Sequence, residues 1–62
     1  MSKYWKLRNE ELGSMDSTKY ETFEDAWKES CNKCCSHGVA EFDAETDEEI
    51  RYYSSSELLF IQ

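Results

Sequence analysis

One helical stripe set between stretches of alternating residues limits the folds open to this chain. Apolar residues recur at the 3.6-residue spacing of an amphipathic helix, at Phe23, Ala26, Trp27, Cys31, Cys34 and Cys35. Thr22 stands at the N-cap position with Asp25 three residues on, so we expect the helix to begin near Phe23. Gly38 suits the residue that ends it. A chain of 62 residues holds one such helix and one small sheet, which predicts a single domain over residues 1–62.

Strands are predicted on both sides of the helix. Residues 4–8 alternate, with Trp5 and Leu7 on one face, as in a strand with one buried face. Residues 10–19 hold turn-forming side chains and predict a loop or a loose hairpin. Residues 39–44 and 50–54 predict an antiparallel hairpin. The apolar run within residues 57–62 predicts a further strand.

These elements give an α+β fold in the order β-α-β-β-β. One helix packs on a sheet of three or four antiparallel strands, with the core on the face that the helix covers. The large apolar side chains predict the members of that core, namely Trp5, Leu7, Phe23, Trp27, Phe42, Tyr52, Leu58 and Phe60.

The cysteines are interpreted first as core residues. Cys31, Cys34 and Cys35 all fall on the helical stripe, and free cysteine behaves as a small buried hydrophobe. A structural zinc site draws its ligands from two chain segments, and here His37 is the one further soft ligand, so we expect no metal and no cofactor. A thiol or metal protein remains a weaker alternative. With a single histidine and no glycine-rich phosphate loop, we expect no enzymatic activity.

An acidic run follows the helix. It resembles a calcium loop beginning at Asp43, but Glu48 replaces the glycine of position six and Ser54 replaces the glutamate of position twelve, so the match fails. Read as a strand, the run places Glu41, Asp43 and Glu45 on one face at a spacing of about 6.7 Å. Such a row of negative charges resembles the phosphates of a nucleic acid backbone. The simpler interpretation is a solvated face that has no partner.

The charge balance restricts the partners. Fourteen acidic and seven basic residues give a net charge of −7, which repels nucleic acid and anionic lipid and attracts basic protein surfaces. We therefore expect no direct nucleic acid or membrane binding. The amino end has no apolar run of signal-peptide length, and three closely spaced cysteines suit a reducing compartment, which predicts a cytoplasmic location.

In size and composition, the chain resembles the small acidic inhibitors made by phages and mobile elements, among them DNA-mimic anti-restriction and anti-CRISPR proteins. The resemblance rests on the acidic residues and on a compact aromatic core, and it involves no specific motif. It implies a non-enzymatic decoy that occupies a Lys/Arg-lined nucleic-acid channel of a host defence complex, in the cytoplasm of the host cell.

The first functional hypothesis is accordingly a binding protein whose carboxylates compete with nucleic acid for a basic site on a larger protein. The expected partner-binding residues are Glu10, Glu11, Asp25, Glu29, Glu41, Asp43, Glu45, Asp47, Glu48 and Glu49. The alternative is a small assembly subunit or homodimer that uses apolar sheet surface or an open sheet edge. Its expected contact residues are Tyr4, Tyr53, Leu59 and Ile61.

Overall fold

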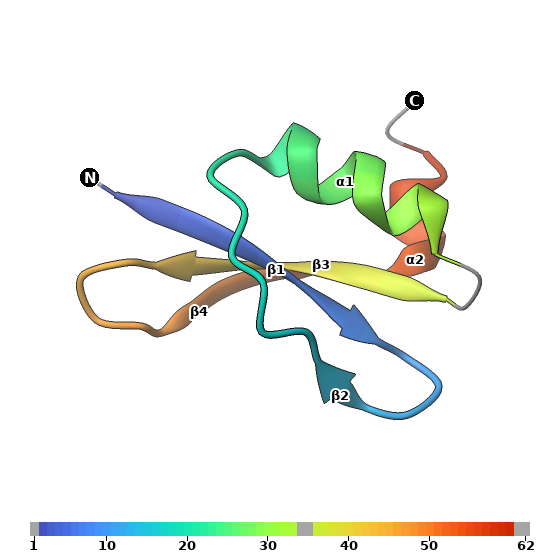
Figure 1. Cartoon of the computed structure of the whole chain (residues 1–62), viewed down its shortest axis with the longest axis horizontal. Helices are drawn as coiled ribbons and strands as arrows, with labels where there is room; N and C mark the ends of the chain where they lie inside the picture. The colour runs from blue at the N-terminus through green and yellow to red at the C-terminus, as the bar shows by residue number, and fades with distance from the viewer. Residues whose placement is uncertain (1, 34–35, 61–62) are drawn as a thin grey trace.

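One helix covers one face of a four-stranded antiparallel sheet (Figure 1), which confirms the α+β prediction. The structure is a computed structural model that describes residues 2–33 and 36–60. Within these ranges the elements are β1 (Lys3–Asn9), β2 (Ser14–Met15), α1 (Phe23–Asn32), β3 (His37–Asp43), β4 (Glu49–Tyr53) and a one-turn helix α2 (Ser55–Leu58).

The sheet has the order β2-β1-β3-β4, with β1 and β3 at its centre. These two strands pair along their whole length, with Leu7 opposite Val39 and Tyr4 opposite Phe42. Because successive side chains alternate between faces, the first pair lies under α1 and the second pair lies on the uncovered face. The strand predicted at residues 4–8 is confirmed.

The predicted hairpin at the acidic run is also confirmed, as β3 and β4. Its register shifts at one point: Glu41 lies opposite Arg51, whereas Phe42 lies opposite Glu49. Ile50 is therefore an additional residue in β4, and this β-bulge places the side chains of Glu49 and Arg51 on opposite faces of the sheet.

The segment between β1 and α1 covers the outer edge of β1. β2 pairs with the end of β1, and the backbone N–H of Asp16 donates to the carbonyl of Leu7 at 2.8 Å. Further along, Trp5 and Tyr20 exchange two backbone hydrogen bonds of 2.9 and 2.8 Å. The loose hairpin predicted for residues 10–19 is thus confirmed, and it supplies the fourth strand of the sheet.

Helix α1 begins where its cap predicted and ends earlier than expected. The hydroxyl of Thr22 accepts a hydrogen bond from the backbone N–H of Asp25 at 3.1 Å, so the cap is formed. The helix ends at Asn32, however, and Gly38 lies inside β3, so its predicted role as the helix stop is wrong. A glycine is needed there for a packing reason, because a Cβ atom on Gly38 would overlap the ring and hydroxyl of Tyr52.

The predicted helical stripe faces the sheet through Phe23, Ala26 and Trp27, but not through Cys31. Ala26 and Ser30 are its buried members, and the Ser30 hydroxyl donates to the carbonyl of Trp27 at 2.6 Å. Cys31 is exposed, which corrects its assignment to the core. At about 100° per residue, Cys31 lies about 80° from Phe23 on the side away from Ala26, at the margin of the buried face. Cys34 and Cys35 lie outside the described residues.

The C-terminal segment forms a helical turn, and the strand predicted within residues 57–62 is wrong for its described part. Ser54 caps α2, its hydroxyl accepting from the backbone N–H of Glu57 at 3.3 Å. Among the described residues of the apolar run only Leu58 is buried, and Phe60 is 89% exposed. A single inward-facing apolar side chain fits one turn of helix. In the sequence, a short apolar run does not distinguish a helix from a strand.

The core lies between α1, α2 and the sheet. It consists of Leu7, Ala26, Val39 and Leu58, against which half-buried rings pack from Trp5, Tyr20, Phe23, Trp27 and Tyr53. Of the predicted members, Phe60 is wrong because it is exposed, and Phe42 and Tyr52 are half-buried on the opposite face of the sheet.

Candidate functional site

Residues 43–48, the last residue of β3 and the turn that follows it, hold four carboxylates and no basic side chain, and we call this segment the acidic turn. Its backbone is fixed by local hydrogen bonds: the Asp43 carboxylate accepts from the N–H of Glu45 at 2.8 Å, and the Asp43 carbonyl accepts from the N–H of Asp47 at 2.7 Å. Asp47 has a φ of 61°, a left-handed conformation that aspartate tolerates in turns. Glu45, Asp47 and Glu48 are exposed.

The acidic turn is also tied to the sheet. The hydroxyl of Tyr4 in β1 donates to the carboxylate of Asp47 at 2.9 Å. Burial, followed by the Asp47 contact, raises the pKa of Tyr4 above its usual value, so the hydroxyl remains a donor through neutral pH. The turn therefore presents its remaining carboxylates from an ordered backbone.

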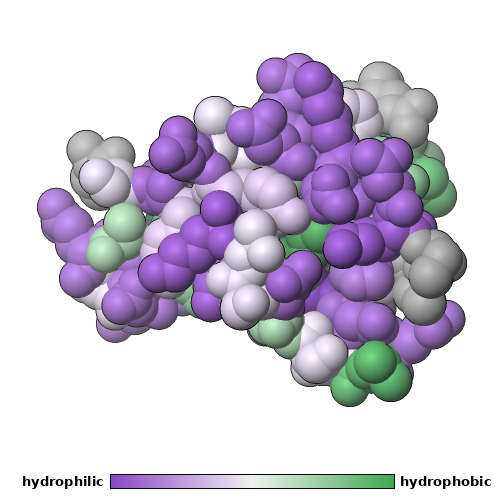
Figure 2. Space-filling view, in the orientation of Figure 1, coloured by the Kyte–Doolittle hydropathy of each residue, from purple (hydrophilic) through white to green (hydrophobic). Residues whose placement is uncertain are grey.

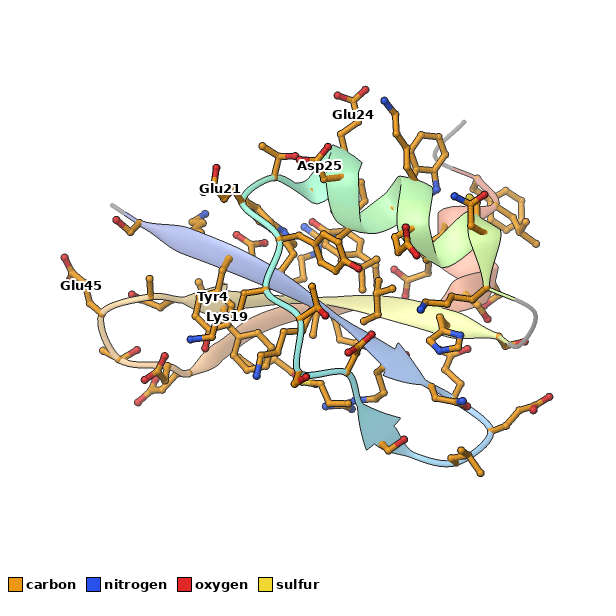
Figure 3. The ribbon with its side chains drawn as sticks, viewed as in Figure 1. Tyr4, Lys19, Glu21, Glu24, Asp25 and Glu45 are labelled. Atoms are coloured by element: carbon orange, nitrogen blue, oxygen red, sulfur yellow. The ribbon has the colours of Figure 1, made fainter. Side chains whose placement is uncertain are left out.

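A second group of carboxylates surrounds the start of α1, and we call it the acidic helix start. It consists of Glu21, Glu24 and Asp25, which Figure 3 shows close together at the first turn of α1, with Glu45 at the tip of the hairpin. Negative side chains are favourable at a helix N-terminus because the backbone N–H groups carry partial positive charge there. Glu21 and Glu24 were not among the predicted partner-binding residues. Their positions next to the Thr22 cap are the sequence signal that could have placed them at the helix N-terminus.

The predicted row of Glu41, Asp43 and Glu45 does not form a charged face. Glu41 is 8% exposed and lies on the helix-facing side of β3, where its carboxylate pairs with the Lys3 ammonium at 2.8 Å. That hydrogen bond raises the pKa of Lys3. The prediction was wrong because Phe42 and Tyr4 stack on the uncovered face of the sheet. Side chains alternate along β3, so the neighbouring Glu41 points to the helix-covered face, where a buried carboxylate requires a partner.

Several other predicted carboxylates are engaged inside the chain. Glu49 forms an ion pair with Arg8 at 3.1 Å, and Glu29 lies 3.9 Å from Lys33. Glu10 accepts hydrogen bonds from the hydroxyls of Tyr52 and Ser55, each at 2.5 Å. These bonds lower the pKa of Glu10, with Ser55 the largest cause. The structure therefore separates the ten predicted partner-binding residues into structural carboxylates and available ones.

The available carboxylates are exposed, and among the described residues they form no ion pair and accept no hydrogen bond, unlike Asp47 and Glu10. They are Glu11, Asp25, Glu45 and Glu48 from the predicted set, together with Glu21, Glu24 and Glu57. Five of these seven belong to the acidic helix start or to the acidic turn. Figure 2 shows that this side of the molecule is largely hydrophilic over α1 and around the hairpin.

The uncovered sheet face is built differently. The rings of Tyr4 and Phe42 stack with centroids 5.1 Å apart, and the Lys19 ammonium lies 4.7 Å from the Tyr4 centroid. The Arg8 guanidinium lies 5.0 Å from the Tyr52 centroid. Ala40 is completely buried on this face even though no helix covers it. Long cationic side chains therefore cover these rings and the sheet beneath them.

The apolar contact surface predicted for assembly is only partly present. Tyr4 lies on the uncovered face as expected, but Tyr53 packs on Phe23 of α1, with ring centroids 5.0 Å apart. Leu59 is 71% exposed and directly follows α2, so it does not belong to a strand. Ile61 lies outside the described residues.

Within residues 2–33 and 36–60, no group of three histidine, cysteine, aspartate or glutamate side chains is arranged to hold a metal ion, and no cavity is present. The described helices are also too short and too polar to cross a membrane.

Comparison with known protein families, with curated proteins and with solved structures finds no match to this chain.

Proposed function

We propose that this protein is a non-enzymatic binding protein whose carboxylates occupy a cationic nucleic-acid-binding site on a larger protein, such as a host defence complex. The observation that carries the proposal is the pair of exposed acidic positions, the acidic turn and the acidic helix start, whose carboxylates form no ion pair among the described residues and stand on hydrogen-bonded backbone. The proposal places the chain in a reducing cytoplasm, where the exposed thiol of Cys31 stays reduced.

The net charge of the protein favours a cationic partner. A net charge of −7 on 62 residues attracts a Lys/Arg-lined groove and repels nucleic acid itself. Carboxylates held by a fixed turn lose little conformational freedom on binding, so more of the charge attraction appears as affinity. Glu41, Glu49 and Glu10 are excluded from the binding surface, because each already has a partner inside the chain.

The test begins with capture of partners from the lysate of the native host on a tagged chain, followed by mass spectrometry. We expect a nucleic-acid-binding protein, released by a single-stranded or double-stranded DNA oligonucleotide and by rising salt. Recovery of no such protein would overturn the proposal.

Matched charge variants then assign the surface. Glu45→Gln with Glu48→Gln changes the charge by two at the acidic turn, and Glu21→Gln with Glu24→Gln does so at the acidic helix start. Glu11→Gln with Glu57→Gln is the control, because both carboxylates are exposed but belong to neither the acidic turn nor the acidic helix start, so the proposed surface does not include Glu11 although the sequence predicted it there. We expect each test pair to weaken binding about tenfold and the control to change it less than about twofold. Equal effects for all three pairs would show that net charge alone, without a specific surface, governs binding.

A second candidate function is assembly through apolar surface, and it rests on the exposed Leu59 and Phe60 beyond α2. Light scattering separates the two functions. Assembly predicts an oligomer that persists in about 1 M salt, because apolar contacts are not screened, whereas the charge decoy is compatible with a monomer.

A further inference from the structure

Among the described residues, two points of contact attach the C-terminal segment, residues 54–60, to the rest of the molecule, and we call this segment the strap. The first point is Leu58, which is 5% exposed and packs against Leu7, Ala26 and Val39. Beyond it, Leu59 and Phe60 are 71% and 89% exposed, so they contribute little to holding the strap in place.

The second point is a single carboxylate. Glu10, which follows β1, accepts hydrogen bonds from both the hydroxyl and the backbone N–H of Ser55, at 2.5 and 3.2 Å. It also accepts from the hydroxyl of Tyr52 in β4 at 2.5 Å. One side chain therefore joins the end of β1, the end of β4 and the beginning of the strap, across more than 40 residues of sequence.

The strap has little stability of its own. A four-residue helix is far shorter than the length at which an isolated helix persists in water, so α2 depends on its two attachments. In contrast, β1 and β3 pair with each other over seven residues and each has a further strand on its other side. Segments with few buried apolar contacts open at lower free energy than the strands of the same domain.

We propose that the strap is a detachable closure, which opens while α1 and the sheet remain folded and is locked by the Glu10 carboxylate. Opening removes Leu58 from the core and uncovers the apolar side chains of Leu7, Ala26 and Val39 at the end of the helix–sheet interface. This inference does not depend on the proposed function, because none of these residues belongs to the acidic turn or the acidic helix start.

Amide hydrogen exchange under native conditions tests the proposal in the unmodified chain. The N–H groups of Leu58 and Phe60 donate to Ser54 and Glu57 inside the strap, so their exchange reports its opening. We expect these amides to exchange faster than those of β1 and β3, with a much weaker dependence on denaturant, since opening exposes less surface than unfolding. Equal exchange free energies and denaturant slopes for strap and strands would overturn the proposal.

Variants test the lock. Glu10→Gln removes the charge that accepts the Ser55 bonds, and we expect exchange at Leu58 and Phe60 to accelerate about tenfold with little change in β3. Ser55→Ala leaves the Tyr52 contact in place and is expected to act in the same direction. Glu11→Gln, at the exposed neighbouring carboxylate, is the control and should change neither region. If Glu10→Gln accelerates strap and strands equally, the carboxylate supports the whole fold and locks no separate segment.

Discussion

At the scale of single residues, Gly38 and Tyr52 show how a missing side chain positions another one. Tyr52 crosses β3 at the place where Gly38 has no Cβ, and its hydroxyl then reaches Glu10. The aromatic ring is covered on its outer side by the guanidinium of Arg8. The glycine is therefore required by a close approach within the sheet, although its sequence position suggests a helix end.

Substitution of this glycine is expected to be destabilising. In Gly38→Ala, the new methyl group overlaps the Tyr52 ring and lies close to the Tyr53 carbonyl, so we expect the free energy of unfolding to fall by about 1–3 kcal/mol. Urea denaturation followed by tryptophan fluorescence measures the change. Ser17→Ala, at an exposed position, is the control, and equal stability of the two variants would contradict the packing argument.

The Glu10 carboxylate predicts a pH dependence of stability. Its hydrogen bonds to Ser55 and Tyr52 lower the pKa of Glu10 in the folded state below the ordinary value of 4.5. Between the lowered pKa and the ordinary one, the unfolded state binds more protons than the folded state. The stabilisation by Glu10 is therefore fully present above the ordinary pKa and is lost as the pH falls through the lowered pKa. His37 adds a favourable charge nearby.

Denaturation of wild type and Glu10→Gln between pH 3 and 7 isolates this stabilisation, since the two curves should converge as the pH falls below the ordinary pKa of 4.5. Glu11→Gln should run parallel to wild type throughout. A constant difference between wild type and Glu10→Gln across this range would show that the hydrogen bonds do not depend on ionisation.

At the scale of elements, local signals in the sequence predicted where helix α1 begins better than where it ends. The start of α1 was predictable because its cap is made by residues three apart, Thr22 and Asp25, and needs no distant contact. The end of α1 was not, because Gly38 belongs to a strand for a reason supplied by Tyr52. The C-terminal turn was missed because burial of Leu58 and the Glu10 contact, both long-range, decide between helix and strand.

The cap of α1 should contribute measurably to stability. Thr22→Ala leaves the N–H of Asp25 without its acceptor, and we expect a loss of about 1 kcal/mol in the free energy of unfolding. Thr18→Ala removes the same atoms from an exposed loop position and is the matched control in thermal or chemical denaturation. A Thr22→Ala variant as stable as Thr18→Ala would show that tertiary packing alone fixes the start of the helix.

At the scale of the whole molecule, the excess of acid was predictable but its distribution was not. Composition gives the net charge of −7 directly. Which carboxylates are available depends on the sheet register, which turns Glu41 inward toward Lys3 and brings Glu49 to Arg8. The β-bulge at Ile50 decides the second of these pairings, and no local pattern in the sequence marks it.

Self-repulsion predicts that salt stabilises this protein. With twice as many acidic as basic residues, the folded state concentrates negative charge, and screening weakens that repulsion more than it weakens the three ion pairs among the described residues. We expect the melting temperature to rise between about 10 mM and about 1 M sodium chloride. The neutralised pair Glu45→Gln with Glu48→Gln should show a smaller rise, and a melting temperature that falls with salt would contradict this account.

The segment that covers β1 has a consequence for how such sheets could join. On that side, Trp5 uses both of its outward backbone groups on Tyr20, and the Leu7 carbonyl accepts from Asp16, whereas β4 forms the other edge of the sheet. A sheet with one edge covered can extend only from its other edge. Two chains that paired through β4 would therefore leave no free edge of comparable length for a third chain. Fibril growth by edge-strand pairing would therefore stop at a dimer.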